Sequence, residues 1–276
     1  MSGGNGEHSP SPRPVVLLHG WPVTQAHWRD LLPLLSNAGF APIPISLPGL
    51  GVAPGGIRNY RKSALAARLA EQFTEQGLTR FAVIGHDWGA TVAVLLAAAK
   101  PDAVTALVVE EEILPGIAAS IPAPGSENYP SWHGPFNRQS GLAEHLVPGR
   151  EDAYYGTFFQ QSAGPAGLDR AVVRAYIDAY QADGVLEAGL GYYRTRADDI
   201  ADVGWLREHP IRTPVLAIGG RYAMGSAVAE GLRPPAADIR SIIMERSGHY
   251  PVEQEPESSA GAVIEFLEQH HPSGFC

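Results

Sequence analysis

A carboxylate occupies the centre of the segment Gly85-His86-Asp87-Trp88-Gly89. This spacing is typical of a nucleophile elbow, a sharp strand-to-helix turn in which flanking glycines let the chain bend and expose one side chain. The usual residue there is serine, which needs a base and suits carbonyl substrates. Asp87 is instead ionised at neutral pH, so it can displace a leaving group from an sp³ carbon. The product would be an ester of the enzyme that water must hydrolyse, which favours epoxides or alkyl halides as substrates.

Hydrolysis of such an ester needs a general base, and His249 is the best candidate. It follows Gly248 after an apolar segment near the end of the chain, where a base is expected when the order is nucleophile, acid, histidine. We expect His249 to activate the water. Backbone N–H groups of Trp21 and Trp88 would stabilise the developing oxyanion on the carboxyl group of Asp87.

The acid that orients His249 has to be chosen among three neighbours. The loop 219–225, after the next-to-last predicted strand, contains no carboxylate, whereas Glu110, Glu111 and Glu112 follow an earlier apolar strand. Three adjacent carboxylates would repel one another unless at least one has a cationic partner. Side-chain alternation in a strand turns Glu111 away from its two neighbours.

Strands and helices alternate along most of the chain, which predicts an α/β fold with a doubly wound, mostly parallel sheet. Ligands bind such sheets at the carboxyl ends of the strands, where Trp21, Asp87 and Glu111 fall. The predicted strands are 15–18, 41–46, 81–84, 103–110, 214–218 and 239–244. The predicted helices are 26–38 with a break at Pro33, 63–76 with Ser63 as its cap, 90–100 and 260–269.

The alternation stops between residues 116 and 209, where aromatic residues are frequent. Helices are expected near 143–146, 153–161 and 170–182, and the segment could form a helical cap, or lid. The predicted organisation is therefore a core of residues 14–115 and 210–276, a cap of 116–209, and a disordered N-terminus of residues 1–13.

Composition excludes several classes of protein. Of the 276 residues, 45% are hydrophobic, which indicates a globular chain. The net charge of −9 argues against a nucleic-acid partner. The single cysteine, Cys276, and the lack of metal-ligand spacing among the histidines predict no metal and no cofactor. No apolar stretch is long enough to span a membrane, and the N-terminus lacks a signal-peptide core, so a cytoplasmic protein is expected. The sequence leaves open whether the protein is a monomer or a homodimer.

Taken together, these motifs resemble the epoxide hydrolases of the α/β-hydrolase family, and the resemblance covers nearly the whole chain from Arg13 on. The segments that carry it are His19-Gly20-Trp21-Pro22, Gly85-His86-Asp87-Trp88-Gly89-Ala90, Ser247-Gly248-His249, Trp132-His133-Gly134-Pro135-Phe136 and Gly191-Tyr192-Tyr193-Arg194. The resemblance implies an α/β-hydrolase fold with a cap inserted after the strand that follows the elbow helix. It also implies opening of an epoxide to a vicinal diol.

The same resemblance implies individual roles. Asp87 is the expected nucleophile and His249 the base, and the context Glu111-Glu112-Ile113-Leu114-Pro115 favours Glu111 as the acid. Tyr193 and His133 are the expected donors to the epoxide oxygen. The aromatic residues expected to bind an apolar or aromatic substrate are Trp88, Trp132, Phe136, Tyr192 and Tyr250.

Two alternatives remain. The first is a dehalogenase of haloalkane type that uses the same aspartate, although haloacids are disfavoured. The haloacetate branch carries carboxylate-binding arginines at the positions that are Trp88 and Thr91 here. The second is a non-catalytic or biosynthetic accessory protein that keeps the fold, against which the complete set Asp87, Glu111 and His249 argues.

Overall fold

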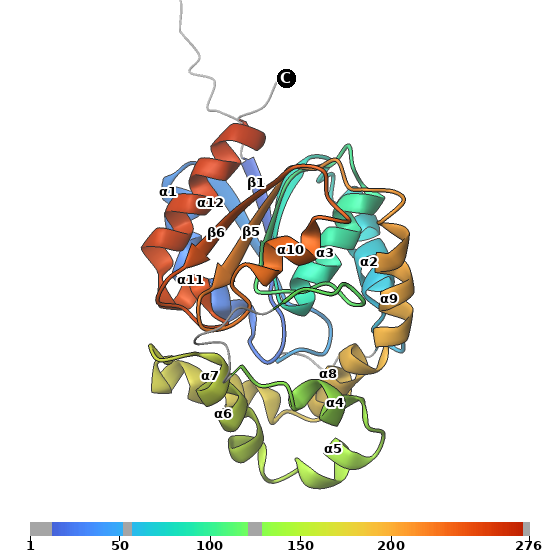
Figure 1. The fold of residues 1–276 in the computed structure, drawn as a ribbon, viewed down its shortest axis with the longest axis vertical. Helices are drawn as coiled ribbons and strands as arrows, with labels where there is room; N and C mark the ends of the chain where they lie inside the picture. The colour runs from blue at the N-terminus through green and yellow to red at the C-terminus, as the bar shows by residue number, and fades with distance from the viewer. Residues whose placement is uncertain (1–12, 52–56, 121–128, 273–276) are drawn as a thin grey trace, which may run out of the picture.

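The computed structural model describes residues 13–51, 57–120 and 129–272. Its centre is a six-stranded parallel sheet with the strand order β2-β1-β3-β4-β5-β6 (Figure 1). The doubly wound parallel sheet predicted from the sequence is therefore confirmed. The strands are β1 (Arg13–Leu18), β2 (Phe40–Ile45), β3 (Phe81–His86), β4 (Val104–Glu110), β5 (Val215–Gly220) and β6 (Ile239–Met244).

Helices cover both faces of the sheet, because alternate side chains of each strand point to opposite sides. In β1, Val15 and Leu17 pack with α1 (Leu31–Asn37) and α12 (Pro256–His270). Val16 and Leu18 belong to the core on the other face, formed with α2 (Lys62–Glu75), α3 (Trp88–Ala99) and α10 (Ala227–Leu232). The short helix α11 (Pro251–Gln254) leads into α12.

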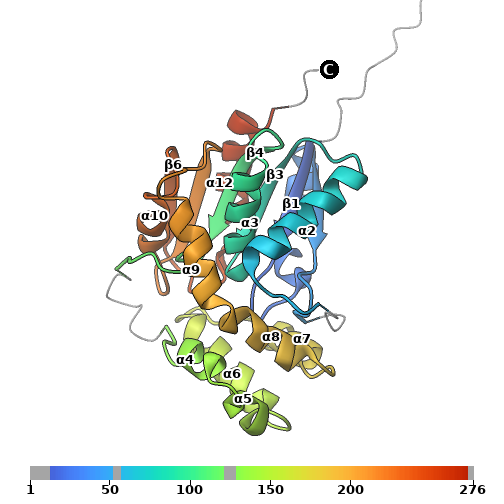
Figure 2. The same ribbon diagram turned by 90° about the vertical axis from the view of Figure 1, so that its right-hand side faces the viewer.

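The predicted cap segment divides into two parts (Figures 1 and 2). Helices α4 to α8 lie beyond the carboxyl ends of the strands. The last helix of the segment, α9, instead packs against α2 beside the sheet. The predicted lid, residues 116–209, therefore includes one helix that lies beside the sheet. The reason is that α9 has partners on α2, among them the pair of Asp199 and Lys62. The helices are α4 (His133–Arg138), α5 (Leu142–Leu146), α6 (Glu151–Ser162), α7 (Arg170–Tyr180), α8 (Val185–Arg194) and α9 (Arg196–Trp205).

Local details differ from the sequence predictions at two helix starts. The predicted helix 26–38 consists of a 3₁₀ turn, Gln25–Trp28, followed by α1. Pro33 does not break α1, because it lies in the first turn, where no backbone N–H is required. Helix α2 begins before Ser63, which is therefore not its cap. The predicted disordered N-terminus lies outside the described residues except for Arg13, which begins β1.

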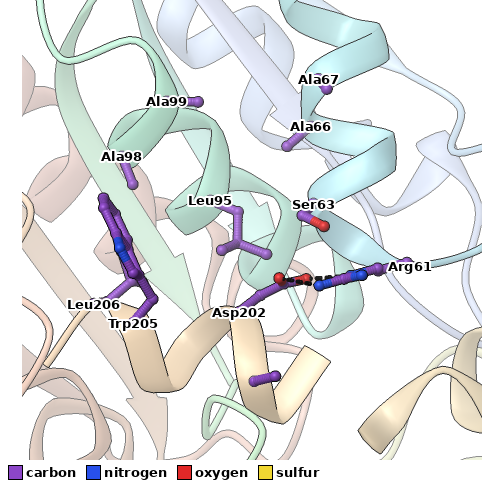
Figure 3. A pocket seen from close by; sticks show the side chains of 11 residues that line it. Arg61, Ser63, Ala66, Ala67, Leu95, Ala98, Ala99, Asp202, Trp205 and Leu206 are labelled. Atoms are coloured by element: carbon purple, nitrogen blue, oxygen red, sulfur yellow. Dashed lines mark hydrogen bonds and ion pairs between the residues drawn. The ribbon is translucent and has the colours of Figure 1, made fainter. Parts of the chain in front are cut away.

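A cavity of about 540 Å³ lies where α2, α3 and α9 meet (Figure 3). Its walls are mostly apolar, and an ion pair between Arg61 and Asp202 closes one end. Asp87 is not among the lining residues. Within the described ranges, no helix is both long and apolar enough to cross a membrane.

Candidate active site

Asp87 lies at the turn between β3 and α3, in the conformation that the elbow motif predicts. Its backbone φ is 51°, in the left-handed region that non-glycine residues rarely adopt. The turn requires glycine at the two flanking positions, because a Cβ at either one would collide with the backbone. A Cβ on Gly85 would lie 2.5 Å from Cα of Ala90, and one on Gly89 would lie 2.2 Å from the carbonyl oxygen of Leu18.

The carboxylate of Asp87 is held from the β1 side of the site. The backbone N–H of Trp21 donates a 2.8 Å hydrogen bond to Oδ1 of Asp87. The two segments approach so closely that a Cβ on Gly20 would lie 2.4 Å from both Cβ and Oδ1 of Asp87. One predicted oxyanion donor, Trp21, is thus in contact with the carboxylate. The other predicted donor is the N–H of Trp88, the first residue of α3, which directly follows Asp87.

His249 and Glu111 form a buried pair on the other side of Asp87. Nδ1 of His249 lies 3.0 Å from Oε2 of Glu111, and both side chains are fully buried. Backbone N–H groups of Gly220 and Met224 donate to Oε1 of Glu111 at 2.6 and 3.2 Å. The carboxylate can only accept, so Nδ1 of His249 carries a proton and Nε2 faces Asp87 at 3.7 Å. That distance is too long for a hydrogen bond.

The three consecutive glutamates have three separate sets of partners. Glu111 has a φ of 50°, so the chain leaves β4 sharply and strand alternation no longer applies. Oε2 of Glu110 lies 3.3 Å from Nε2 of His27, and Oε1 accepts from the N–H of Val252 at 2.9 Å. Oε1 of Glu112 accepts from the hydroxyl of Thr91 at 2.6 Å. Only Glu111 contacts His249.

Burial and charge set the protonation states of these groups. Burial alone would lower the pKa of His249, but its contacts with Asp87 and Glu111 outweigh this and raise the pKa to about 9. Burial raises the pKa of Glu111, and His249 opposes that rise. Burial and the charge of Asp87 raise the pKa of Glu112 to about 8, so its carboxyl group is mostly neutral at pH 7.

Two predicted cap residues, Tyr193 and His133, lie in a cluster of aromatic rings close enough to Asp87 to feel its charge. The ring of Tyr193 meets Trp88 edge-on at 5.2 Å between centroids and Trp21 at 5.4 Å. His133 stacks on Trp21 at 5.8 Å and lies 5.7 Å from Tyr193. Burial and the charge of Asp87 raise the pKa of Tyr193 well above 10, so its hydroxyl keeps its proton.

The tautomer of His133 limits what this residue can do. Its Nδ1 lies 2.6 Å from the carbonyl oxygen of Pro130, which can only accept, so Nδ1 carries the proton. Burial lowers the pKa of His133 to about 4, so the ring is neutral at pH 7. Nε2 then has a lone pair and no proton to donate. This geometry favours Tyr193 over His133 as a donor.

The aromatic residues predicted to bind substrate fall into different environments. Trp132 and Phe136 pack against Tyr154 of α6, whereas Trp88 contacts Tyr193 directly. Tyr250 and Tyr192 have structural partners. The hydroxyl of Tyr250 bonds Ser162 at 2.8 Å, and that of Tyr192 donates to the carbonyl oxygen of Pro48 at 3.0 Å.

Two further aromatic residues join the cluster that the sequence reasoning did not assign to the site. The ring of Phe158 lies 4.7 Å from Trp21, and that of Tyr129 lies 5.3 Å from His249. The repeated aromatic pairs of α6, at positions 154, 155, 158 and 159, were the available signal for Phe158. In the part of the chain that the structure describes, no cluster of three or more His, Cys, Asp or Glu side chains could hold a metal ion.

The model of the α/β hydrolase fold matches residues 13–173, which is more than half of the chain. The chain therefore belongs to the α/β hydrolase fold family. It is 25% identical over 262 residues to the soluble epoxide hydrolase of Corynebacterium sp. (strain C12), covering 92% of this chain and 90% of that protein. The crystal structure of Cfl2 from Burkholderia cenocepacia superposes with a TM-score of 0.85 at 29% identity, covering 93% of this chain and 88% of that one.

A relative of another activity is similar to the same extent. The fluoroacetate dehalogenase of a Burkholderia species is 25% identical over 269 residues, covering 92% of this chain and 86% of that protein. The predicted resemblance to epoxide hydrolases is confirmed, and overall identity alone does not separate the two activities.

Proposed function

We propose that this protein is an epoxide hydrolase that opens an epoxide to a vicinal diol through an ester on Asp87. The observation that carries the proposal is the position of the Asp87 carboxylate. It accepts a hydrogen bond from the Trp21 N–H and lies 3.7 Å from Nε2 of His249. A carboxylate in this place attacks an sp³ carbon, and His249 with Glu111 serves the hydrolysis that must follow.

In the first step, one Asp87 oxygen attacks a ring carbon, and the C–O bond of the epoxide breaks. The ring oxygen then takes the proton of the Tyr193 hydroxyl. The high pKa of Tyr193 keeps that proton available, and its position above Trp88 and Trp21 supports this role. His133 becomes a donor only when its ring is protonated at both nitrogens, so we assign most of the proton donation to the epoxide oxygen to Tyr193.

In the second step, Nε2 of His249 takes a proton from water, and the hydroxide attacks the carbonyl carbon of the ester. The bond between that carbon and the substrate oxygen breaks, and the substrate oxygen takes the proton back from His249 to complete the diol. The carboxyl proton left on Asp87 then returns through water to the Tyr193 oxygen, which restores both residues. When this step begins, ester formation has already neutralised Asp87, which removes one of the two carboxylates that raise the pKa of His249. His249 is consequently a stronger acid in the ester than in the free enzyme, and more of it is in the neutral form that the step requires. The Trp21 N–H stabilises the oxyanion.

The surroundings of Asp87 support an apolar or aromatic substrate. Rings of Trp21, Phe158, Tyr193 and Tyr129 gather near the nucleophile and the base. Buried aromatic walls with a few polar groups are typical of sites for small apolar molecules.

A single turnover in ¹⁸O-water tests the mechanism. With styrene oxide as substrate and enzyme in excess, we expect ¹⁸O in the Asp87 peptide and an unlabelled diol. The reason is that water attacks the ester carbonyl, so the oxygen lost to the diol comes from Asp87. Label in the diol with none in the peptide would show direct attack of water and would refute the ester.

One observation favours halide displacement as a second candidate. The indole Nε1 of Trp88 is buried and forms no hydrogen bond to any described residue, so it could donate to a leaving halide. Assays with 1-bromohexane and 1,2-epoxyhexane separate the two functions. Diol formation without bromide release supports the epoxide hydrolase, and bromide release alone supports the dehalogenase.

A further inference from the structure

A lysine without a role in the proposed reaction is buried between the core and the cap. Lys62 is the first residue of α2, and its side chain is 0% exposed. Its Nζ lies 2.8 Å from Oδ2 of Asp199, a residue of α9 that is also fully buried. Burial lowers the pKa of Lys62, and Asp199 is the main opposing influence. A charge this deep is stable only while its partner is present.

Asp199 binds α2 through the backbone as well. Its Oδ1 accepts the N–H of Lys62 at 2.9 Å, at the helix start where backbone donors lack partners within the helix. The hydroxyl of Thr195 completes the cluster, 3.0 Å from Nζ of Lys62 and 2.9 Å from Oδ2 of Asp199. Helix α9 is thus fixed on the N-terminus of α2 by three mutually bonded side chains.

The ammonium group of Lys62 also contacts the chain neighbours of Tyr193 and of Asp87. Nζ of Lys62 also donates to the backbone carbonyl of Tyr192, the residue before Tyr193. It lies 4.0 Å from the ring centroid of Trp88, the residue after Asp87. Tyr193 packs edge-on against that same ring. Lys62 therefore contacts the backbone that carries the predicted donor and the ring on which the donor rests.

We propose that Lys62, with Asp199, is a positioning residue that holds the Tyr193 hydroxyl in place over Asp87 for ring opening. This proposal rests on the proposed function. Ring opening needs Tyr193 and ester hydrolysis does not, so loss of the pair slows the first step and leaves the second nearly unchanged.

A nearby ion pair provides a matched control. Arg61, the N-cap residue immediately before α2, pairs with Asp202, which lies three residues after Asp199 in α9. Nε of Arg61 lies 2.7 Å from Oδ2 of Asp202, at the rim of the cavity in Figure 3, and the arginine side chain is 37% exposed. It contacts neither Trp88 nor the Tyr192 carbonyl, so Arg61→Met removes a link between helices without disturbing the donor.

The test measures ester formation and ester hydrolysis separately, in single turnovers of styrene oxide by the full chain. The double variant Lys62→Met/Asp199→Leu removes both charges at once, since a single change would leave a buried charge unpaired. We expect ester formation to fall about 10- to 100-fold, as for a reacting group displaced by about 1 Å. Hydrolysis should stay within about twofold, and Arg61→Met should change neither rate.

A double-mutant cycle separates positioning from a general loss of packing. In a Tyr193→Phe background, the double variant should cause no further loss of ester formation. Thr195→Val keeps both charges and should slow ester formation by a smaller factor. Because this variant disturbs folding least, it tests the proposal even if the double variant does not fold. An unchanged ester-formation rate, an equal loss from Arg61→Met, or an additive loss in the Tyr193→Phe background overturns the proposal. Absence of an Asp87 ester in the unaltered protein overturns the proposed function itself.

Discussion

Glu111→Gln isolates the acid of the catalytic set with little change in shape. The glutamine oxygen can still accept from the N–H groups of Gly220 and Met224, which now hold Oε1. Its NH₂ group would then face Nδ1 of His249, where the carboxylate oxygen lies at 3.0 Å. An NH₂ group can only donate, so Nδ1 would lose its proton and Nε2 would gain one. Protonated Nε2 cannot accept a proton from water.

The size of the effect follows from these contacts. A hydrogen bond between charged or partly charged groups contributes about 1.5–3 kcal/mol, which corresponds to roughly 10- to 150-fold in rate. The wrong tautomer adds to this loss, and the equivalent amide substitution in a serine protease costs about 10⁴-fold. We therefore expect ester hydrolysis to slow by about 10²- to 10⁴-fold. Ester formation should change less than about tenfold, because Glu111 does not contact the carboxylate that attacks.

Intact-protein mass spectrometry during turnover of styrene oxide measures both steps. The variant should accumulate protein heavier by one substrate molecule, at a rate close to that of the unaltered enzyme. Glu112→Gln is the matched control. The carboxyl group of Glu112 is mostly neutral at pH 7, and its contact with Thr91 can persist in the amide. Equal accumulation of ester in both variants, or its absence in Glu111→Gln, would refute the assignment of the acid.

Four other outcomes are expected. Tyr193→Phe should slow ester formation by about 10²- to 10⁴-fold, with hydrolysis unchanged in rapid-quench experiments. Gly20→Ala should fold, as judged by circular dichroism, but lose at least about 100-fold in kcat, because its Cβ would lie 2.4 Å from Asp87. The kcat should rise with pH as His249 loses its proton, with a midpoint below 9 in a pH–rate profile. Burial lowers the pKa of His27, but Glu110 and Glu253 outweigh this effect and raise the pKa in the folded protein to about 9. The free energy of unfolding, from urea titrations, should therefore fall as the pH rises from about 6.5 to 9, because folded His27 loses its proton in this range. His27→Gln should weaken this dependence, and an unchanged slope would contradict the assignment.

The elements that position the nucleophile could be predicted from sequence because their signals are local. The glycines around Asp87 and the apolar strand before it specify the elbow within one short segment, from Phe81 to Gly89. Strand alternation alone could not single out Glu111 among the three glutamates, since alternation applies only while the strand continues. Glu111 leaves the strand with a φ of 50°, and the three partners that separate the glutamates come from distant parts of the chain.

The cap was harder to predict in detail. Helices α4, α8 and α9 had no separate prediction. The short α4 contains Gly134 and Pro135, and α8 contains two glycines, which are weak helix formers. Helix α9 buries the charged residue Asp199, which an apolar pattern does not reveal. The burial of Lys62 could not be foreseen, since its partner Asp199 lies 137 residues later. A lysine at a helix start is ordinarily exposed, and only the folded arrangement supplies its counter-charge.

The proton donor and the hydrolytic residues of the proposed reaction come from separate layers of the molecule. Asp87, Glu111 and His249 belong to the sheet and its loops, whereas Tyr193 belongs to α8. The hydrolytic machinery can therefore be inherited unchanged while the residues above it diversify. A chimaera that joins this core to the cap of a relative should exchange the range of epoxides accepted, yet retain the native rate of ester breakdown.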